Sequence, residues 1–241
     1  MTVLIDLASY LDEVEAFLAL ADGFIERASV PRVQEAVRDL KTGIELGERE
    51  WTWCTRNDVL FRASRHYDGP NKAHADTTFE LGFTIQFRRL KSTKKRSTVW
   101  SIANGSTRVT VRKGDRELPF HFDYKNSSQW GPQLHFQVHE RIGDLAIPRI
   151  CSTAFLPTDC ADLMLAELHH EDWRATQAAG SNSRHVGLIR DAQENRSRAY
   201  IEDVARLWRD GARSRTRLTM LQDYTASVVG LPDHRGRVAA F

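Results

Sequence analysis

The sequence lacks the features of a membrane protein and of a disulfide-rich protein. No apolar run approaches the about 20 residues that a membrane-spanning helix needs, so we expect no membrane contact. Only three of the 241 residues are cysteines, and no two form a C-x-x-C pair, which favours free thiols in a reducing compartment. No basic segment precedes the first apolar positions, so we expect no signal peptide and a cytoplasmic location.

Familiar catalytic motifs are missing as well. The sequence has no P-loop, no glycine-rich dinucleotide fingerprint, no G-x-S-x-G and no H-E-x-x-H. We therefore expect no cofactor and no metal ion. A zinc site of Cys151, Cys160, His135 and His139 is conceivable, but its spacing matches no known zinc finger.

The composition is that of a globular protein, and its charge is unevenly distributed. Hydrophobic residues make up 41% of the chain, and the net charge is only +2. Residues 1–50 carry 5 basic and 11 acidic side chains, whereas residues 51–126 carry 15 and 7, a balance of +8. The basic middle could attract an anionic partner, or it could attract the acidic N-terminal segment of the same chain.

The N-terminal segment has the apolar spacing of a helix, which we expect to extend from Leu4 to Ile25, followed by a second helix from about Val33 to Glu50. The stripe is wide, which favours packing on the body of the same chain. The alternative is a protein partner or a homo-oligomer that uses this stripe. Its residues are Leu4, Leu7, Leu11, Val14 and Leu18.

A change to a period of two predicts an antiparallel sheet. Apolar and polar residues alternate from Thr77 to Phe87 and again from Gln133 to Glu140. Asn104-Gly105 is a strong hairpin signal, because both central positions of a type I′ turn need a positive φ. That turn would pair Ile102 with Thr107.

Gly114-Asp115 predicts a second turn, which would pair Val109 with Phe120 and place Arg112 opposite Glu117. The two turns give the same apolar face, so each supports the register of the other.

The fold class that follows is α+β: a five-stranded antiparallel meander with one face covered by N- and C-terminal helices, as a two-layer sandwich. We expect one domain over residues 1–241. Its parts are a helical segment (1–50), the sheet (77–140), C-terminal helices (157–230, over about 158–170, 184–209 and 218–229) and a tail (231–241).

The region from about residue 100 to residue 173 resembles a group of bacterial domains of unknown function. The order of features is "FHFDY", "QLHFQVHE", "IPRI" and "LPTDCADLMLAEL", ending near "EDW". Those domains share a strand with spaced histidines, an Arg-Ile-Pro-like turn and a closing helix. The resemblance implies a bacterial protein, and it implies no particular activity.

Four candidate catalytic residues fall on the polar face of the predicted sheet, together with Arg108: His121, Asp123, His135 and His139. His135 and His139 are about 13 Å apart along one strand, so one metal ion could not hold both. Two residues from neighbouring strands could hold one metal ion more easily. The alternatives are a solvated sheet face, or a face covered by the helix at 184–209 that would bury these histidines.

A basic loop from Arg88 to Arg96 could contact phosphates without reading sequence, or it could be a solvated hairpin tip. The candidate nucleic-acid-binding residues are Arg88, Arg89, Lys91, Lys94, Lys95, Arg96, Arg108 and Arg112.

Three functions follow as hypotheses. The first is a bacterial interaction protein that engages nucleic acid, or a partner bound to nucleic acid, through this loop and the polar sheet face. The second is a phosphodiester hydrolase, metal-dependent or metal-independent, with His121 or His135 as the base and Arg108 as the charge stabiliser. The third is a structural subunit of a larger complex.

Overall fold

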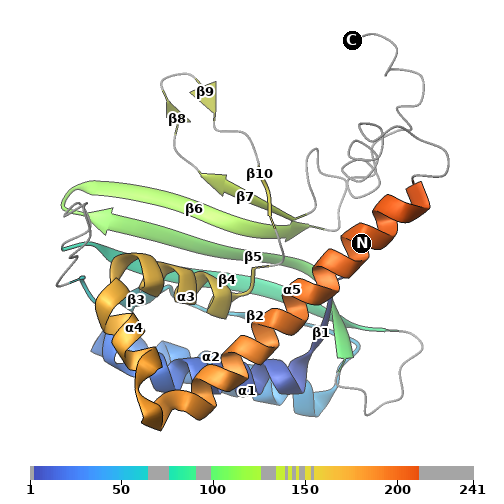
Figure 1. Cartoon of the computed structure of the whole chain (residues 1–241), viewed down its shortest axis with the longest axis horizontal. Helices are drawn as coiled ribbons and strands as arrows, with labels where there is room; N and C mark the ends of the chain where they lie inside the picture. Colours follow the sequence, from blue (N-terminus) through green and yellow to red (C-terminus); the bar gives the residue numbers. More distant parts are fainter. Residues whose placement is uncertain are drawn as a thin grey trace.

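The structure is a computed structural model, and it describes residues 3–64, 76–90, 99–125, 134–138, 141–142, 145–146, 150–152 and 155–211. Within these residues the chain forms five α-helices and a large antiparallel sheet, which confirms the α+β class (Figure 1). The helices are α1 (Leu7–Ala21), α2 (Val30–Leu46), α3 (Pro157–Leu168), α4 (His170–Ala178) and α5 (Ser183–Gly211).

The large sheet has eight strands, where the sequence predicted five. Its order is β10-β7-β6-β5-β4-β2, while β1 pairs with β5 and β3 pairs with β4. These strands are β1 (Leu4–Asp6), β2 (Glu50–Cys54), β3 (Val59–Phe61), β4 (Thr78–Arg89), β5 (Val99–Lys113), β6 (Arg116–Lys125), β7 (Leu134–Val138) and β10 (Ile150–Cys151). A separate pair joins β8 (Arg141–Ile142) to β9 (Leu145–Ala146).

The turn between β5 and β6 is the one predicted at Gly114-Asp115. Gly114 has a φ of 57°, a conformation that glycine adopts without strain. Val109 pairs with Phe120, and Arg112 pairs with Glu117, with which it also forms an ion pair. The predicted register of this hairpin is therefore confirmed.

The hairpin predicted at Asn104-Gly105 is wrong. Strand β5 continues through both residues, and Gly105 has no positive φ. Here β5 is a central strand, since Gly105 pairs with Ile85 of β4 on one side and with Tyr124 of β6 on the other. These long-range pairings outweigh the local preference of Asn-Gly for a turn.

The hydrophobic core lies between the helices and one face of the sheet. Strands β4, β5 and β6 contribute alternate residues to it, among them Phe79, Val109 and Phe122. In Figure 1, α5 crosses the other helices diagonally, and it packs against α1. No helix of the described residues combines the length and the apolar character needed to cross a membrane.

The N-terminal stripe faces the protein's own core. Leu7 and Val14 are buried, whereas Leu11 and Leu18 are partly buried and pack against the same core. Leu4 lies in β1, ahead of the helix, and is 50% exposed. The buried members of the stripe are thus not available to a second chain.

The C-terminal helices also differ in detail from the prediction. Helix α3 begins at Pro157, and the Asp159 carboxylate accepts a hydrogen bond from the Leu156 N–H at 2.9 Å. The hydroxyl of Thr158, in the first turn of α3, donates a hydrogen bond to Glu13 on α1 at 2.8 Å. The helix expected over 218–229 and the tail at 231–241 lie outside the described residues.

Candidate metal centre

Three of the four candidate catalytic residues come together on the sheet. His121 and Asp123 are two residues apart on β6 and therefore project from the same face. His135 on β7 stands directly opposite Asp123 in the register. Asp123 Oδ2 lies 3.3 Å from His121 Nε2 and 3.7 Å from His135 Nε2. One ligand atom from each residue lies within 4.8 Å of the other two.

All three side chains are buried, with exposed fractions of 9% for His121, 4% for Asp123 and 1% for His135. They lie on the face of the sheet opposite to Phe120 and Phe122, which join the helix-covered core. The face is thus not solvated at this point. Helix α5, which we considered as its cover, packs against α1.

The geometry of this cluster fits a divalent transition metal ion. Nitrogen and oxygen ligands at about 2.1 Å from zinc are about 3.4 Å apart in a tetrahedral site. The two distances from Asp123 Oδ2 lie on either side of that value. Two imidazoles and one carboxylate are a donor set of zinc and of non-haem iron(II), and three protein ligands leave a position for water. The cluster of His121, Asp123 and His135 is therefore a candidate metal site, although the sequence led us to expect none.

Of the other residues of the conceivable zinc site, Cys160 lies apart from this cluster. Cys160 is buried on α3 in the helix-covered core, where burial raises the pKa of its thiol well above the usual value. Cys151 stands opposite His135 in the register of β7 and β10. His139 lies outside the described residues.

The described arginines of the proposed nucleic-acid surface are engaged within the protein. Arg88 donates two hydrogen bonds to the Glu50 carboxylate, at 2.9 and 3.2 Å, which lower the pKa of Glu50. Arg89 lies 4.9 Å from the centre of the Trp100 ring. Arg112 contacts two carboxylates, those of Glu80 and Glu117. Lys91, Lys94, Lys95 and Arg96 lie outside the described residues.

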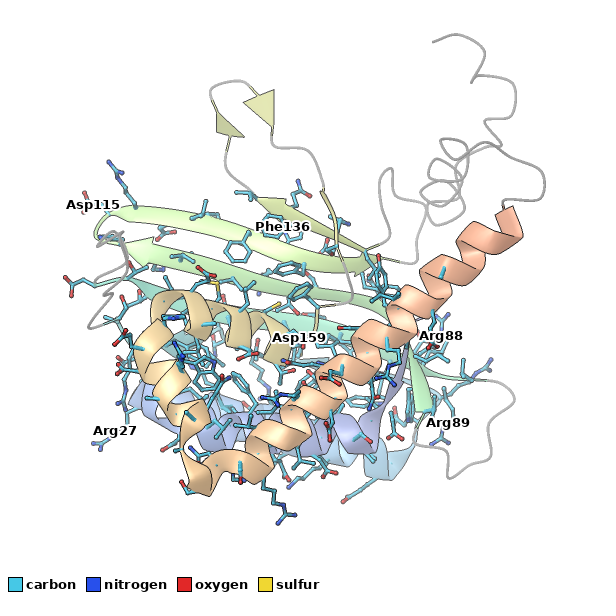
Figure 2. The ribbon with its side chains drawn as sticks, viewed as in Figure 1. Arg27, Arg88, Arg89, Asp115, Phe136 and Asp159 are labelled. Carbon is cyan, nitrogen blue, oxygen red and sulfur yellow. The ribbon has the colours of Figure 1, made fainter. Side chains whose placement is uncertain are left out.

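These arginines also lie farther apart than the predicted hairpin implied. Arg88 pairs with Ser101, and Arg112 lies eleven residues farther along the continuous strand β5, about 35 Å at the usual rise per residue. Figure 2 shows Arg88 and Arg89 at the end of the sheet opposite to Asp115. Arg88 and Arg112 therefore do not belong to one local cluster of arginines on the sheet.

Arg108 lies beside the candidate metal centre in the register of the sheet. It stands opposite His121 in the register of β5 and β6, on the same face. Its side chain is 61% exposed and forms an ion pair with Asp58 at 3.4 Å. Sequence reasoning missed Asp58, because no local pattern links the loop after β2 to this face.

Comparison of the chain with family models, with curated proteins and with solved structures found no match. The resemblance to bacterial domains of unknown function therefore stays a prediction.

Proposed function

We propose that this protein is a metal-dependent hydrolase of phosphodiesters, with a metal ion held by His121, Asp123 and His135. The observation that supports it is the convergence of one ligand atom from each residue within 4.8 Å. Two imidazole nitrogens and a carboxylate oxygen are ligand types that a divalent transition metal ion takes in proteins.

The chemistry follows from the donor set. A zinc ion held by these three residues would lower the pKa of a bound water to about 7 and would so supply a hydroxide near neutral pH. In phosphodiester hydrolysis that hydroxide would form a bond to phosphorus while the bond from phosphorus to one ester oxygen breaks, and the leaving oxygen would take a proton from solvent water to become the alcohol. As ligands, His121 and His135 cannot also be the base expected from the sequence. Their role would be to hold the metal ion in place.

The charge of the chain favours an anionic substrate. Residues 51–126 have a balance of +8, and they include His121, Asp123 and Arg108. The guanidinium of Arg108 projects from the same face as the three ligands, one strand away from His121. Nucleic acid is the phosphodiester that this charge favours. The interaction hypothesis has less support, because three of its described arginines, Arg88, Arg89 and Arg112, contact acidic or aromatic partners.

The test combines metal loading with two kinds of substrate. The protein is stripped with a chelator, reloaded in turn with Zn²⁺, Mn²⁺, Fe²⁺ or Mg²⁺, and assayed on bis-p-nitrophenyl phosphate and on labelled single-stranded RNA and DNA. We expect hydrolysis only after reloading. Asp123→Asn and His135→Ala should abolish it. His170→Ala, which removes an exposed histidine on α4, should not change it.

Two results would contradict the proposal. Stoichiometric metal binding without hydrolysis of any of these substrates would leave a metal-binding protein and remove the hydrolase. Salt-dependent binding of RNA or DNA without hydrolysis, and without a need for metal, would restore the interaction hypothesis.

A further inference from the structure

An ordered insertion interrupts the β2–β3 edge of the sheet, which β4 and β5 separate from the candidate metal centre on β6 and β7. Cys54 of β2 pairs with Thr84, and Val59 of β3 pairs with Leu81. Residues 55–58 therefore stand opposite only two residues of β4. The Phe83 N–H donates to Thr55 Oγ1 at 3.1 Å, and the Thr55 N–H donates to the Phe83 carbonyl at 3.1 Å. Insertions of this kind redirect a side chain at the edge of a sheet.

The redirected side chain is that of Asp58. Its carbonyl accepts a hydrogen bond from Arg32 Nη1 at 2.6 Å, which fixes the end of the insertion. Its carboxylate lies over Gly82 of β4, since a Cβ added to Gly82 would be 1.9 Å from Asp58 Oδ1. Glycine is needed at this position for space, and any other residue would displace the carboxylate.

The carboxylate of Asp58 meets the guanidinium of Arg108. Gly82, Arg108 and His121 form one row across β4, β5 and β6. The contact between Asp58 and Arg108 is a single one of 3.4 Å, longer than a charge-assisted hydrogen bond of about 2.7–2.9 Å, and Arg108 is exposed. An exposed pair with one long contact is weak, so another anion can replace it.

We infer that Arg108 is the phosphate-binding residue of this site and that Asp58 is an internal carboxylate that occupies its guanidinium until a phosphate group replaces it. The planar guanidinium can donate two parallel hydrogen bonds to a phosphate, one more than it gives Asp58. A phosphate held there would lie one strand from His121. The inference rests on the proposed function for its substrate and on the Asp58–Gly82–Arg108 geometry for its site.

Inorganic phosphate provides a test that needs no catalysis. Its affinity for the metal-free full chain is measured by phosphorus NMR titration at low ionic strength. Asp58→Asn removes the competing charge and should raise this affinity about 2- to 5-fold. Arg108→Gln should lower it at least about 10-fold. Arg116→Gln, at the far end of the β5–β6 hairpin, is the matched control and should have no effect.

A second variant tests the same contact through the backbone. Gly82→Ala should displace the Asp58 carboxylate and raise phosphate affinity as Asp58→Asn does, with thermal unfolding used to verify the fold. If Gly82→Ala does not fold, Asp58→Asn decides alone. Phosphate affinity that is unchanged in Asp58→Asn, or unchanged in Arg108→Gln, would overturn the inference.

The outcomes separate this inference from the proposed function. Phosphate binding that depends on Arg108, in a protein that hydrolyses nothing, would keep the phosphate site and remove the hydrolase. Metal-dependent hydrolysis with the same KM in wild type and Arg108→Gln would keep the hydrolase and remove the phosphate site. If both hold, Asp58→Asn should lower KM and leave kcat unchanged.

Discussion

Arg196 on α5 joins three helices through two carboxylates, and its removal provides a quantitative test of the packing. Its guanidinium contacts Glu13 on α1, with one of the bonds at 2.9 Å, and Asp159 on α3 at 2.5 Å. The Glu13 side chain is fully buried and also accepts a hydrogen bond from Thr158 at 2.8 Å. Figure 2 shows Asp159 where α3 approaches α5.

Burial and charge act against each other in this cluster. Burial raises the pKa of Glu13 and of Asp159. Burial alone would lower the pKa of Arg196, but the attraction of Asp159 and Glu13 raises it above its ordinary value. Inside the fold, the attraction between Arg196 and the two carboxylates therefore opposes the cost of burying these groups.

We predict that Arg196→Met lowers the free energy of unfolding by about 3 kcal/mol, because it leaves the buried Glu13 without its cation. This is the lower end of the usual range for a broken buried pair, since Arg196 is still 14% exposed. The double variant Glu13→Leu/Arg196→Met should recover most of the loss, because the charge of Glu13 is removed as well.

Urea unfolding, followed by circular dichroism and tryptophan fluorescence, measures the free energy of unfolding of the single and double variants. Hydrogen exchange should show that α5 loses protection first in Arg196→Met. A loss below about 1 kcal/mol in the single variant would refute the reasoning. So would a double variant whose loss equals the sum of the two single losses, since that would show no coupling between Glu13 and Arg196.

Two further predictions concern backbone conformation and pH. Gly114→Ala should lower the free energy of unfolding by about 1–2 kcal/mol, because φ is 57° at this position. Gly187→Ala, in a helix with open space around the residue, should raise the free energy of unfolding by up to about 1 kcal/mol. Equal urea midpoints in the wild type and both variants would contradict the two predictions. Burial lowers the pKa of His169 from 6.5, and its Nε2–H donates to the Arg62 carbonyl at 3.0 Å. As the pH falls below 6.5, His169 becomes protonated in the unfolded chain before it does so in the folded protein, so the free energy of unfolding should fall. The fall should be smaller in His169→Gln. An equal dependence of stability on pH in the wild type and in His169→Gln would show that His169 does not contribute.

The two predicted turns show what local sequence can and cannot determine. Gly114-Asp115 connects neighbouring strands, so local turn chemistry and strand alternation determine it. Asn104-Gly105 has the stronger local signal, yet it lies inside a central strand whose neighbours are supplied by distant segments. Ala103 has no partner in the β4–β5 register, and this bulge returns Ile102 to the apolar face that the turn would have given it. The residues on the apolar face of β5 were therefore predictable from the sequence, whereas the continuation of the strand through Asn104-Gly105 was not.

The candidate site was predictable to the same extent. Alternation along two strands places His121, Asp123 and His135 on one face, and the antiparallel pairing of β7 with β6 brings His135 opposite Asp123. Their burial, and the approach of Asp58 to Arg108 from 50 residues away, depend on tertiary packing. Contacts across 183 residues, such as that of Arg196 with Glu13, leave no local pattern to detect.

Zinc binding by the stripped full-length protein tests the central claim most directly. Calorimetric titration, with elemental analysis of the purified protein, measures the stoichiometry and the affinity. We predict one metal ion per chain. We also predict that Asp123→Asn and His135→Ala each lose more than the about 10- to 100-fold in affinity that the loss of an outer-shell partner costs, while His170→Ala binds as the wild type does. No stoichiometric binding of a divalent metal ion, or equal affinities in all four proteins, would contradict the metal centre.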